Sequence, residues 1–174
     1  MAQTKIPNEL LELGAKAFGT NSIMIGDTTT GTIDAANQNT GVGVDVFAAL
    51  TTGDSNVAVG FEGLKDNTTG SNNVAIGSQT VANNTTASSN VGIGTGALFT
   101  NTTGASNIAI GVQSLNSNTT ASSNTAIGHQ SLGANTTASN NTAVGYAAGF
   151  SNTTGAQNTS LGHNALYGTT TGSN

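Results

Sequence analysis

The sequence predicts an all-β fold, namely a parallel β-roll or β-solenoid built from coils of seventeen residues. The first observation is a five-residue phrase, Asn73-Val-Ala-Ile-Gly77, that returns every seventeen residues without insertion or deletion. The second is composition, because 24 Gly, one Pro and 6% charged residues depart from an ordinary globular domain. A fixed short period indicates one small unit stacked on itself. Nine copies of the phrase begin at Ser22, Asn39, Asn56, Asn73, Asn90, Asn107, Asn124, Asn141 and Asn158.

The chain therefore divides into residues 1–21, which do not fit the repeat, and a β-roll of nine repeats over residues 22–174. In the first segment, Pro7 can begin a short helix whose apolar side is made of leucines and which Gly14 would end. A helix of that length is not stable alone. We interpret residues 1–21 as an attachment or capping segment, and the alternative is a frayed terminus.

Each coil is numbered from its Asn at position one, and its first half is strand-like. Position four is always aliphatic, whereas position three is nearly always Ala or Gly. Alternate residues of a strand face opposite ways, so one face offers a bulky aliphatic and the other a flat surface. We expect the bulky residues to form the core, and the residues assigned to it at position four are Ile76, Ile93, Ile110 and Ile127.

Position nine is a second apolar site, and the core residues assigned there are Leu98, Leu115 and Leu132. Positions four and nine have opposite parity, so one straight strand cannot point both inward. The Gly at position five is therefore predicted to bend the chain into a second strand. The Asn-Thr-Thr run that follows is typical of turns, with asparagine ladders between coils.

Energetics favour an oligomer. Each coil buries about two aliphatic side chains, worth roughly 3 to 6 kcal/mol, against an ordering cost of about 1 to 2 kcal/mol for each residue. The flat face at position three suggests where further burial comes from, since other chains could approach it closely. We expect a homotrimer packed on this face around a common axis.

Charge excludes several classes of function. All Asp, Glu and Lys lie between Lys5 and Asp66, there is no Arg, and the net charge is −5. Nucleic acids and anionic membranes need clustered cations, so we expect neither as a partner. No apolar run reaches the length of a membrane span, so no membrane insertion is expected. The first residues lack the apolar region of a secretory signal, so we expect the chain to begin in a cytoplasm.

Catalytic signatures are missing as well. The Gly92-Ile-Gly-Thr-Gly96 run could suggest a phosphate loop, but such a loop needs a following helix, and here the repeat continues. Residues 67–174 contain no carboxylate that could orient a histidine for nucleophilic catalysis. Two histidines of one column, His129 and His163, would be about 9 to 10 Å apart, too far to share a metal. We predict no enzyme, no cofactor and no metal.

Position six offers the candidate binding residues. On successive coils it carries His129, Tyr146 and His163, which should form one column, and Tyr167 lies nearby in the sequence. Aromatic rings beside Asn and Gln amides suit neutral glycans, so these four residues are the predicted receptor-binding patch. The alternative is a structural stack of rings. The repeated Thr residues also raise ice binding, but adjacent strand residues point opposite ways, so each coil would offer one outward Thr.

The recurring Asn-Val-Ala-Ile-Gly, Asn-Thr-Ala-Ile-Gly and Asn-Thr-Ala-Val-Gly phrases resemble the left-handed parallel β-roll of trimeric autotransporter adhesin heads (YadA-like). The form containing Asn-Thr-Thr-Gly, and the opening residues 5–22, resemble tail fibres of tailed bacteriophages. This resemblance implies a trimeric phage tail fibre that binds a tail or baseplate protein through its N-terminal segment. It implies a host surface glycan or lipopolysaccharide as receptor, and a virion protein assembled in the host cytoplasm. A bacterial surface or contractile-injection-system adhesin is the alternative, followed by an ice-binding β-solenoid.

Overall fold

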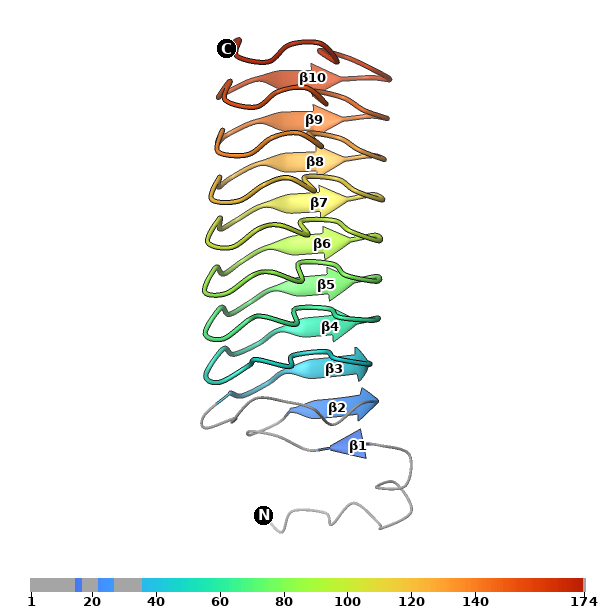
Figure 1. The fold of residues 1–174 in the computed structure, drawn as a ribbon, viewed down its shortest axis with the longest axis vertical. Coiled ribbons are helices and arrows are strands. Elements are labelled where there is room, and N and C mark those ends of the chain that lie inside the picture. Colours follow the sequence, from blue (N-terminus) through green and yellow to red (C-terminus); the bar gives the residue numbers. More distant parts are fainter. Residues whose placement is uncertain (1–14, 17–21, 27–35, 174) are drawn as a thin grey trace.

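The chain forms a β-solenoid with one short strand in each coil, as the computed structural model shows for residues 15–16, 22–26 and 36–173 (Figure 1). All ten strands belong to one sheet in sequence order, β2 to β10 are parallel, and β1 pairs antiparallel with β2. The described residues include no helix. The strands are β1 (Ala15–Lys16), β2 (Ile23–Gly26), β3 (Thr40–Gly43), β4 (Val57–Val59), β5 (Val74–Ile76), β6 (Val91–Ile93), β7 (Ile108–Ile110), β8 (Thr125–Ile127), β9 (Thr142–Val144) and β10 (Thr159–Leu161).

The predicted period sets the register of the sheet. Residues seventeen apart are neighbours, as in the pairing of Ala58 with Ala75 between β4 and β5. Bonds between coils continue beyond the strands, since the Thr68 amide donates to the Thr85 carbonyl at 2.8 Å. Each coil is thus bonded to the next on both its strand side and its turn side, and the prediction of an all-β parallel solenoid is confirmed.

Glycine at position five bends the chain, as predicted, but no second strand follows. These glycines have φ values from +119° to +140°, and a Cβ at Gly60 would collide with the carbonyl oxygen of Gly77. The next residues form turns, with left-handed φ values of 56° at Gln113 and 48° at Leu115, for example. A left-handed residue breaks the alternation of a strand, so the prediction of a second strand is wrong.

Positions three and four face the opposite way from the prediction. The alanines at position three, such as Ala75 and Ala109, are fully buried inside the coil. At position four, Ile76 is 40% exposed, Ile110 is half-buried, and both lie on the outer face of the sheet. Ile93 and Ile127 are likewise exposed, so none of these four belongs to the core of one chain, and the small residues do not form an outer surface.

The reason is the narrowness of the coil. Leucines at position nine reach from the turn side into the interior, and Leu98, Leu115 and Leu132 are buried as predicted. Little room then remains opposite them. At Gly41, an added Cβ would lie 3.1 Å from the Phe47 ring, so even a methyl group would be tight there. A strand that faces such an interior can carry only small residues inward.

Two columns of buried asparagines complete the interior. At position twelve, Asn101 Nδ2 donates to Asn84 Oδ1 at 3.1 Å and to the Gly104 carbonyl at 2.9 Å, and Asn101 Oδ1 accepts from Asn118 Nδ2 at 2.8 Å. This ladder confirms the prediction for the Asn-Thr-Thr run. Among the described residues, every buried side-chain polar atom has a hydrogen-bond partner.

A second ladder, at position one, was not predicted. The Asn107 amide donates to Asn90 Oδ1 at 3.0 Å, and Asn107 Nδ2 donates to the Ala121 carbonyl at 2.8 Å. Position one therefore joins the strand to the preceding coil and ties it to the turn of its own coil. Its signal in the sequence is an Asn that begins eight of the nine phrases, more constant than the strand residues after it.

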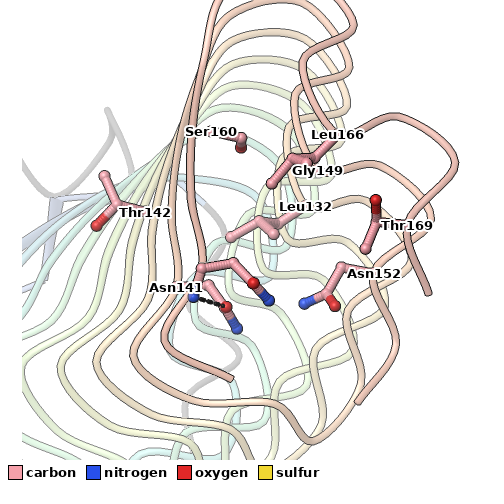
Figure 2. A pocket seen from close by; sticks show the side chains of 9 residues that line it. Leu132, Asn141, Thr142, Gly149, Asn152, Ser160, Leu166 and Thr169 are labelled. Carbon is pink, nitrogen blue, oxygen red and sulfur yellow. Dashed lines mark hydrogen bonds between the residues drawn. The ribbon is translucent and has the colours of Figure 1, made fainter. Parts of the chain in front are cut away.

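Figure 2 looks into this interior near the C-terminal coils, where the side chains of Asn141 and Asn152 lie inside the coil and Leu132 lies beside Gly149. Thr142 points away on the outer side. The internal void lined by these residues measures only about 10 Å³, which is room for one water molecule at most. The interior is packed, so a ligand can be sought only on the outside of the rod.

The predicted short helix at residues 7–14 lies outside the described residues, as does most of the predicted attachment segment. Within that segment, Ala15–Lys16 forms the antiparallel strand β1, with Ala15 opposite Ile25 and Lys16 opposite Met24. The parallel solenoid begins one strand later, at β2. Residues 22–26 already have the register of the later coils.

Candidate functional site

The predicted ring column exists. His129 and Tyr146 stack with their ring centroids 5.2 Å apart and their planes 5° apart, and Tyr146 and His163 stack at 5.0 Å and 11°. The three rings lie in the turns that follow β8, β9 and β10. They stack because position six repeats in register from coil to coil, at the spacing of neighbouring strands.

The geometry of this column limits what it can bind. Tyr146 has a ring against each of its faces, so a sugar cannot stack on either one. The column is exposed, with Tyr146 49% accessible. Tyr146 therefore offers a ring edge and a phenol hydroxyl rather than an aromatic face. A receptor-binding role for His129, Tyr146 and His163 stays a prediction, and a contact with Tyr146 would be made at its ring edge.

Tyr167 does not join that column. It stacks instead on Phe150, with ring centroids 5.4 Å apart and planes 11° apart, and both rings occupy position ten of their coils. The structure thus separates the four predicted receptor residues into a column of three and a second ring pair. The second pair includes Phe150, which was not among the predicted receptor residues. Phe150 occupies the same position as Tyr167 in the preceding coil.

No cluster of three or more His, Asp or Glu side chains that could hold a metal occurs in the described part of the chain. His129 and His163 lie on either side of Tyr146 in the column. The Tyr146 ring between them keeps the two imidazoles from meeting at one ion. The predictions of no metal and no cofactor rest on the sequence.

Charged side chains near the N-terminal coils are engaged in local contacts. Lys65 Nζ bonds to Glu62 Oε1 at 3.1 Å, and Gln79 Nε2 donates to Glu62 Oε2 at 2.8 Å. The pKa of Glu62 is lowered chiefly by the hydrogen bond from Gln79 and next by the bond from Lys65. The bond to Glu62 in turn raises the pKa of Lys65. A neighbouring carboxylate, Asp54, accepts from the Asn37 amide at 2.7 Å. These groups brace turns between adjacent coils.

The threonines of the Asn-Thr-Thr run behave as two different columns. At position thirteen the hydroxyl donates to a carbonyl of the next coil, as Thr68 does to Thr85 at 2.9 Å. At position fourteen the side chain is exposed, for example in Thr69 and Thr86. One outward Thr for each coil is what the sequence predicted, and it provides a single file rather than the paired array that suits ice.

A cleft on the outer surface was missed by the sequence reasoning. It lies at Gly133, between the amides of Gln113 and Gln130 and the ring of Phe150, and has a volume of about 230 Å³. The available signal was the sequence of residues at position ten, where Gly133 comes between Asn116 and Phe150. Only the stacking of coils brings these residues of three coils around one space.

The fold and these surfaces define a repeat protein, a β-solenoid with one strand in each coil. Comparison of the chain with protein-family models, with curated proteins and with solved structures found no match. In the described residues, no helix is long and apolar enough to cross a membrane.

Proposed function

We propose that this protein is a trimeric tail fibre of a bacteriophage, which attaches the virion to a receptor on the host surface. The observation that carries the proposal is the outer face of the sheet. From β2 to β8, the outer face carries an aliphatic side chain at position four of every coil and at position two of every coil except those with Thr40 and Thr125. The members of this stripe with 36–42% exposure are Ile23, Ile25, Val42, Val59, Ile76, Ile93, Ile108 and Ile127.

An apolar stripe of this length marks an interaction surface, since monomeric proteins rarely expose large contiguous apolar patches. The stripe has two parallel rows, at positions two and four. In a three-fold arrangement, the row at position two of one chain can pack against the row at position four of the next, which closes a ring. This contact differs from the sequence prediction, because it uses the bulky residues of position four instead of the small residues of position three.

The coils support a rod-like role. Bonds between coils extend along the strands and around the turns, so the molecule is stiff in one dimension and can hold a binding surface away from an anchor. The phage assignment rests on the resemblance of the repeats and of residues 5–22 to tail fibres. Under this proposal, residues 1–21 bind a tail or baseplate protein, and the late coils meet a host surface glycan or lipopolysaccharide. The virion is the site of action, after assembly in the host cytoplasm.

Sedimentation velocity tests the trimer. The wild-type chain should have the mass of three chains, and a double variant Ile76→Thr/Ile93→Thr should sediment as one chain while it keeps the circular dichroism of a β-sheet. The matched control, Thr86→Ser/Thr103→Ser, changes exposed residues of the same two coils on the turn side and should remain trimeric. A wild-type mass of one chain, or a trimer that persists in the Ile variant, would contradict the proposal.

Immuno-electron microscopy tests the phage role. Antibodies against this chain should label the tail appendages of purified phage particles from the source strain. Purified trimer should also compete with those particles for attachment to host cells. Label on the bacterial cell surface alone would favour a bacterial surface adhesin. Label on contractile injection particles would favour an adhesin of a contractile injection system.

A further inference from the structure

The cleft at Gly133 is lined by residues of three successive coils. Position ten forms a column on the outside of the rod, with Asn116 one coil before Gly133 and Phe150 one coil after it. Gly133 contributes no side chain, the edge of the Phe150 ring approaches its backbone, and a space of about 230 Å³ remains that residues of three coils line. This volume is below the range of about 300 to 1,000 Å³ that is usual for drug-sized ligands, so the cleft suits one ring-sized unit.

Phe150 provides an aromatic wall. Tyr167, one coil further along, covers one face of its ring. The Cδ2 and Cε2 edge of Phe150 lies against Gly133, where an added Cβ would be 3.0 Å and 2.9 Å from these two atoms. Phe150 lines the cleft and has a ring stacked on one face, that of Tyr167, whereas Tyr146 has a ring stacked on both. Phe150 is therefore the aromatic side chain against which a ligand in the cleft would pack.

The other walls carry neutral hydrogen-bonding groups. Gln130 Nε2 donates to Gln113 Oε1 at 3.1 Å, which fixes both amides and leaves the Gln113 amino group and the Gln130 carbonyl oxygen available. Asn116 Nδ2 donates to the Gly96 carbonyl at 3.0 Å, which leaves its Oδ1 available. The hydroxyl of Ser117 also lines the space. Donors and acceptors thus surround the cleft in fixed positions.

Charge narrows the class of ligand. Residues 67–174 contain no Asp, Glu, Lys or Arg, so an anion or cation in the cleft would have no ion pair. A molecule with hydroxyl groups and one apolar ring face matches the amides and the Phe150 ring. Neutral pyranoses have this combination, since axial C–H groups gather on one face while the hydroxyls lie around the edge.

We propose that the cleft at Gly133 binds one neutral hexopyranose unit. The apolar face of the sugar packs on Phe150, and its hydroxyls bond to Gln113, Gln130 and Asn116. None of the lining residues belongs to a strand, so the cleft is separate from the apolar stripe. The choice of a sugar rests on the proposed attachment to a host glycan, but the cleft is distinct from the column of His129, Tyr146 and His163.

The test is direct binding of free sugars, without cells. Glucose, galactose, mannose and N-acetylglucosamine are titrated into the full-length protein, and saturation-transfer NMR follows their ring protons. We expect at least one neutral sugar to bind weakly, in the millimolar range. Phe150→Ala and Gln113→Leu should each weaken this binding by about tenfold.

Two controls match these changes. Phe99→Ala removes a ring at the same position of an earlier coil, and Thr154→Ala changes an exposed residue on the turn side of the coil that contains Phe150. Both should bind as the wild type does. Gln113 is exposed, so its variant decides the outcome if Phe150→Ala reduces the thermal midpoint.

The proposal is overturned if no neutral sugar binds the wild type, if Gln113→Leu and a folded Phe150→Ala bind normally, or if N-acetylneuraminate binds more tightly than every neutral sugar. Cell attachment separates this proposal from the proposed function. A chain that binds a neutral sugar but does not attach to host cells contradicts the attachment function alone. A chain that attaches to cells but binds none of the sugars contradicts the cleft alone.

Discussion

Positions three and four of each coil are adjacent in the strand, yet they have opposite environments. Ala109 is fully buried, whereas Ile93 and Ile127, in the neighbouring coils, are exposed. In most folds the bulky residue of such a pair would point inward. Here the interior is filled from the turn side by leucines and asparagines, so only a small residue fits opposite them. The comparison shows that in a narrow coil the available space, rather than hydrophobicity, decides which face points inward.

The largest expected effect comes from the interior asparagines. Asn101→Ala would remove two donated bonds and one accepted bond. Asn84 Oδ1 would lose its donor, whereas the Gly104 carbonyl and Asn118 Nδ2 would each keep one bond. An unsatisfied buried group costs about 1 to 3 kcal/mol and a lost hydrogen bond about 0.5 to 1.5 kcal/mol, so we expect a loss of about 3 kcal/mol, measured by urea unfolding. Thr103→Ala, on the exposed column of the same coil, is the control and should change little. A loss as small as that of the control would show that the ladder adds no stability.

Changing the side chains at two adjacent positions of one strand tests the comparison between positions three and four directly. Ala109→Leu should destabilise the fold by about 2 kcal/mol, because overpacking a full interior costs about 1 to 3 kcal/mol. Ile110→Leu, one residue further along β7, keeps the apolar volume of the side chain and should cost less than about 1.5 kcal/mol even in the trimer contact. Thermal unfolding at a fixed protein concentration measures both. Equal losses for the two variants would mean that the inner and outer faces are equally constrained.

A smaller effect is expected from pH at the surface. The pKa of Glu62 is lowered from its ordinary value of 4.5 by the hydrogen bonds from Gln79 and Lys65. A carboxyl whose pKa is lower in the folded state contributes stability above its unfolded pKa and loses it as pH falls through the folded value. The thermal midpoint should therefore fall between about pH 5 and pH 3. Glu62→Gln should show less of this fall, and an identical pH profile for the two proteins would contradict the assignment.

The smallest effect is predicted for salt. Residues 67–174 have no Asp, Glu, Lys or Arg, so ion pairs within that stretch cannot hold the coils together, and salt screens only charged contacts. We expect the thermal midpoint of the full chain to change little between low and high NaCl. The Glu62→Gln variant should respond equally weakly. A large drop of the thermal midpoint in high NaCl would contradict this prediction, because it would require stabilising ion pairs.

The sequence was enough to predict the period, the parallel register and the bend at each position-five glycine. Register follows from a repeat without insertions, and for the same reason His129, Tyr146 and His163 could be placed in one stack. The inward face could not be predicted, because alternation leaves two choices and residue size favoured the wrong one. The missing second strand could not be predicted either, since nothing about Leu115 alone indicates a left-handed backbone.

The candidate binding site was predictable only in part. The ring column followed from position six, but the fact that Tyr146 is covered on both faces appears only when the rings are placed in space. The cleft depends on three coils at once, which contribute Asn116, Gly133 and Phe150. A reading of one coil at a time cannot detect such a space, whereas a reading down each column of the repeat would have identified the gap.

The unbroken register has a consequence for how the length of the rod can change. Every coil presents the same alternation of donors and acceptors on each of its two edges, since the Thr40 amide donates to the Asn56 carbonyl and the Gly60 amide donates back to the Val42 carbonyl. The side-chain ladders at positions one and twelve run in a single direction. A segment of one whole period can therefore be deleted or duplicated without creating a mismatched junction. Recombination between repeats then becomes a means of adjusting reach, so that the distance between anchor and tip can vary in steps of about 4.8 Å while every coil keeps its own contacts.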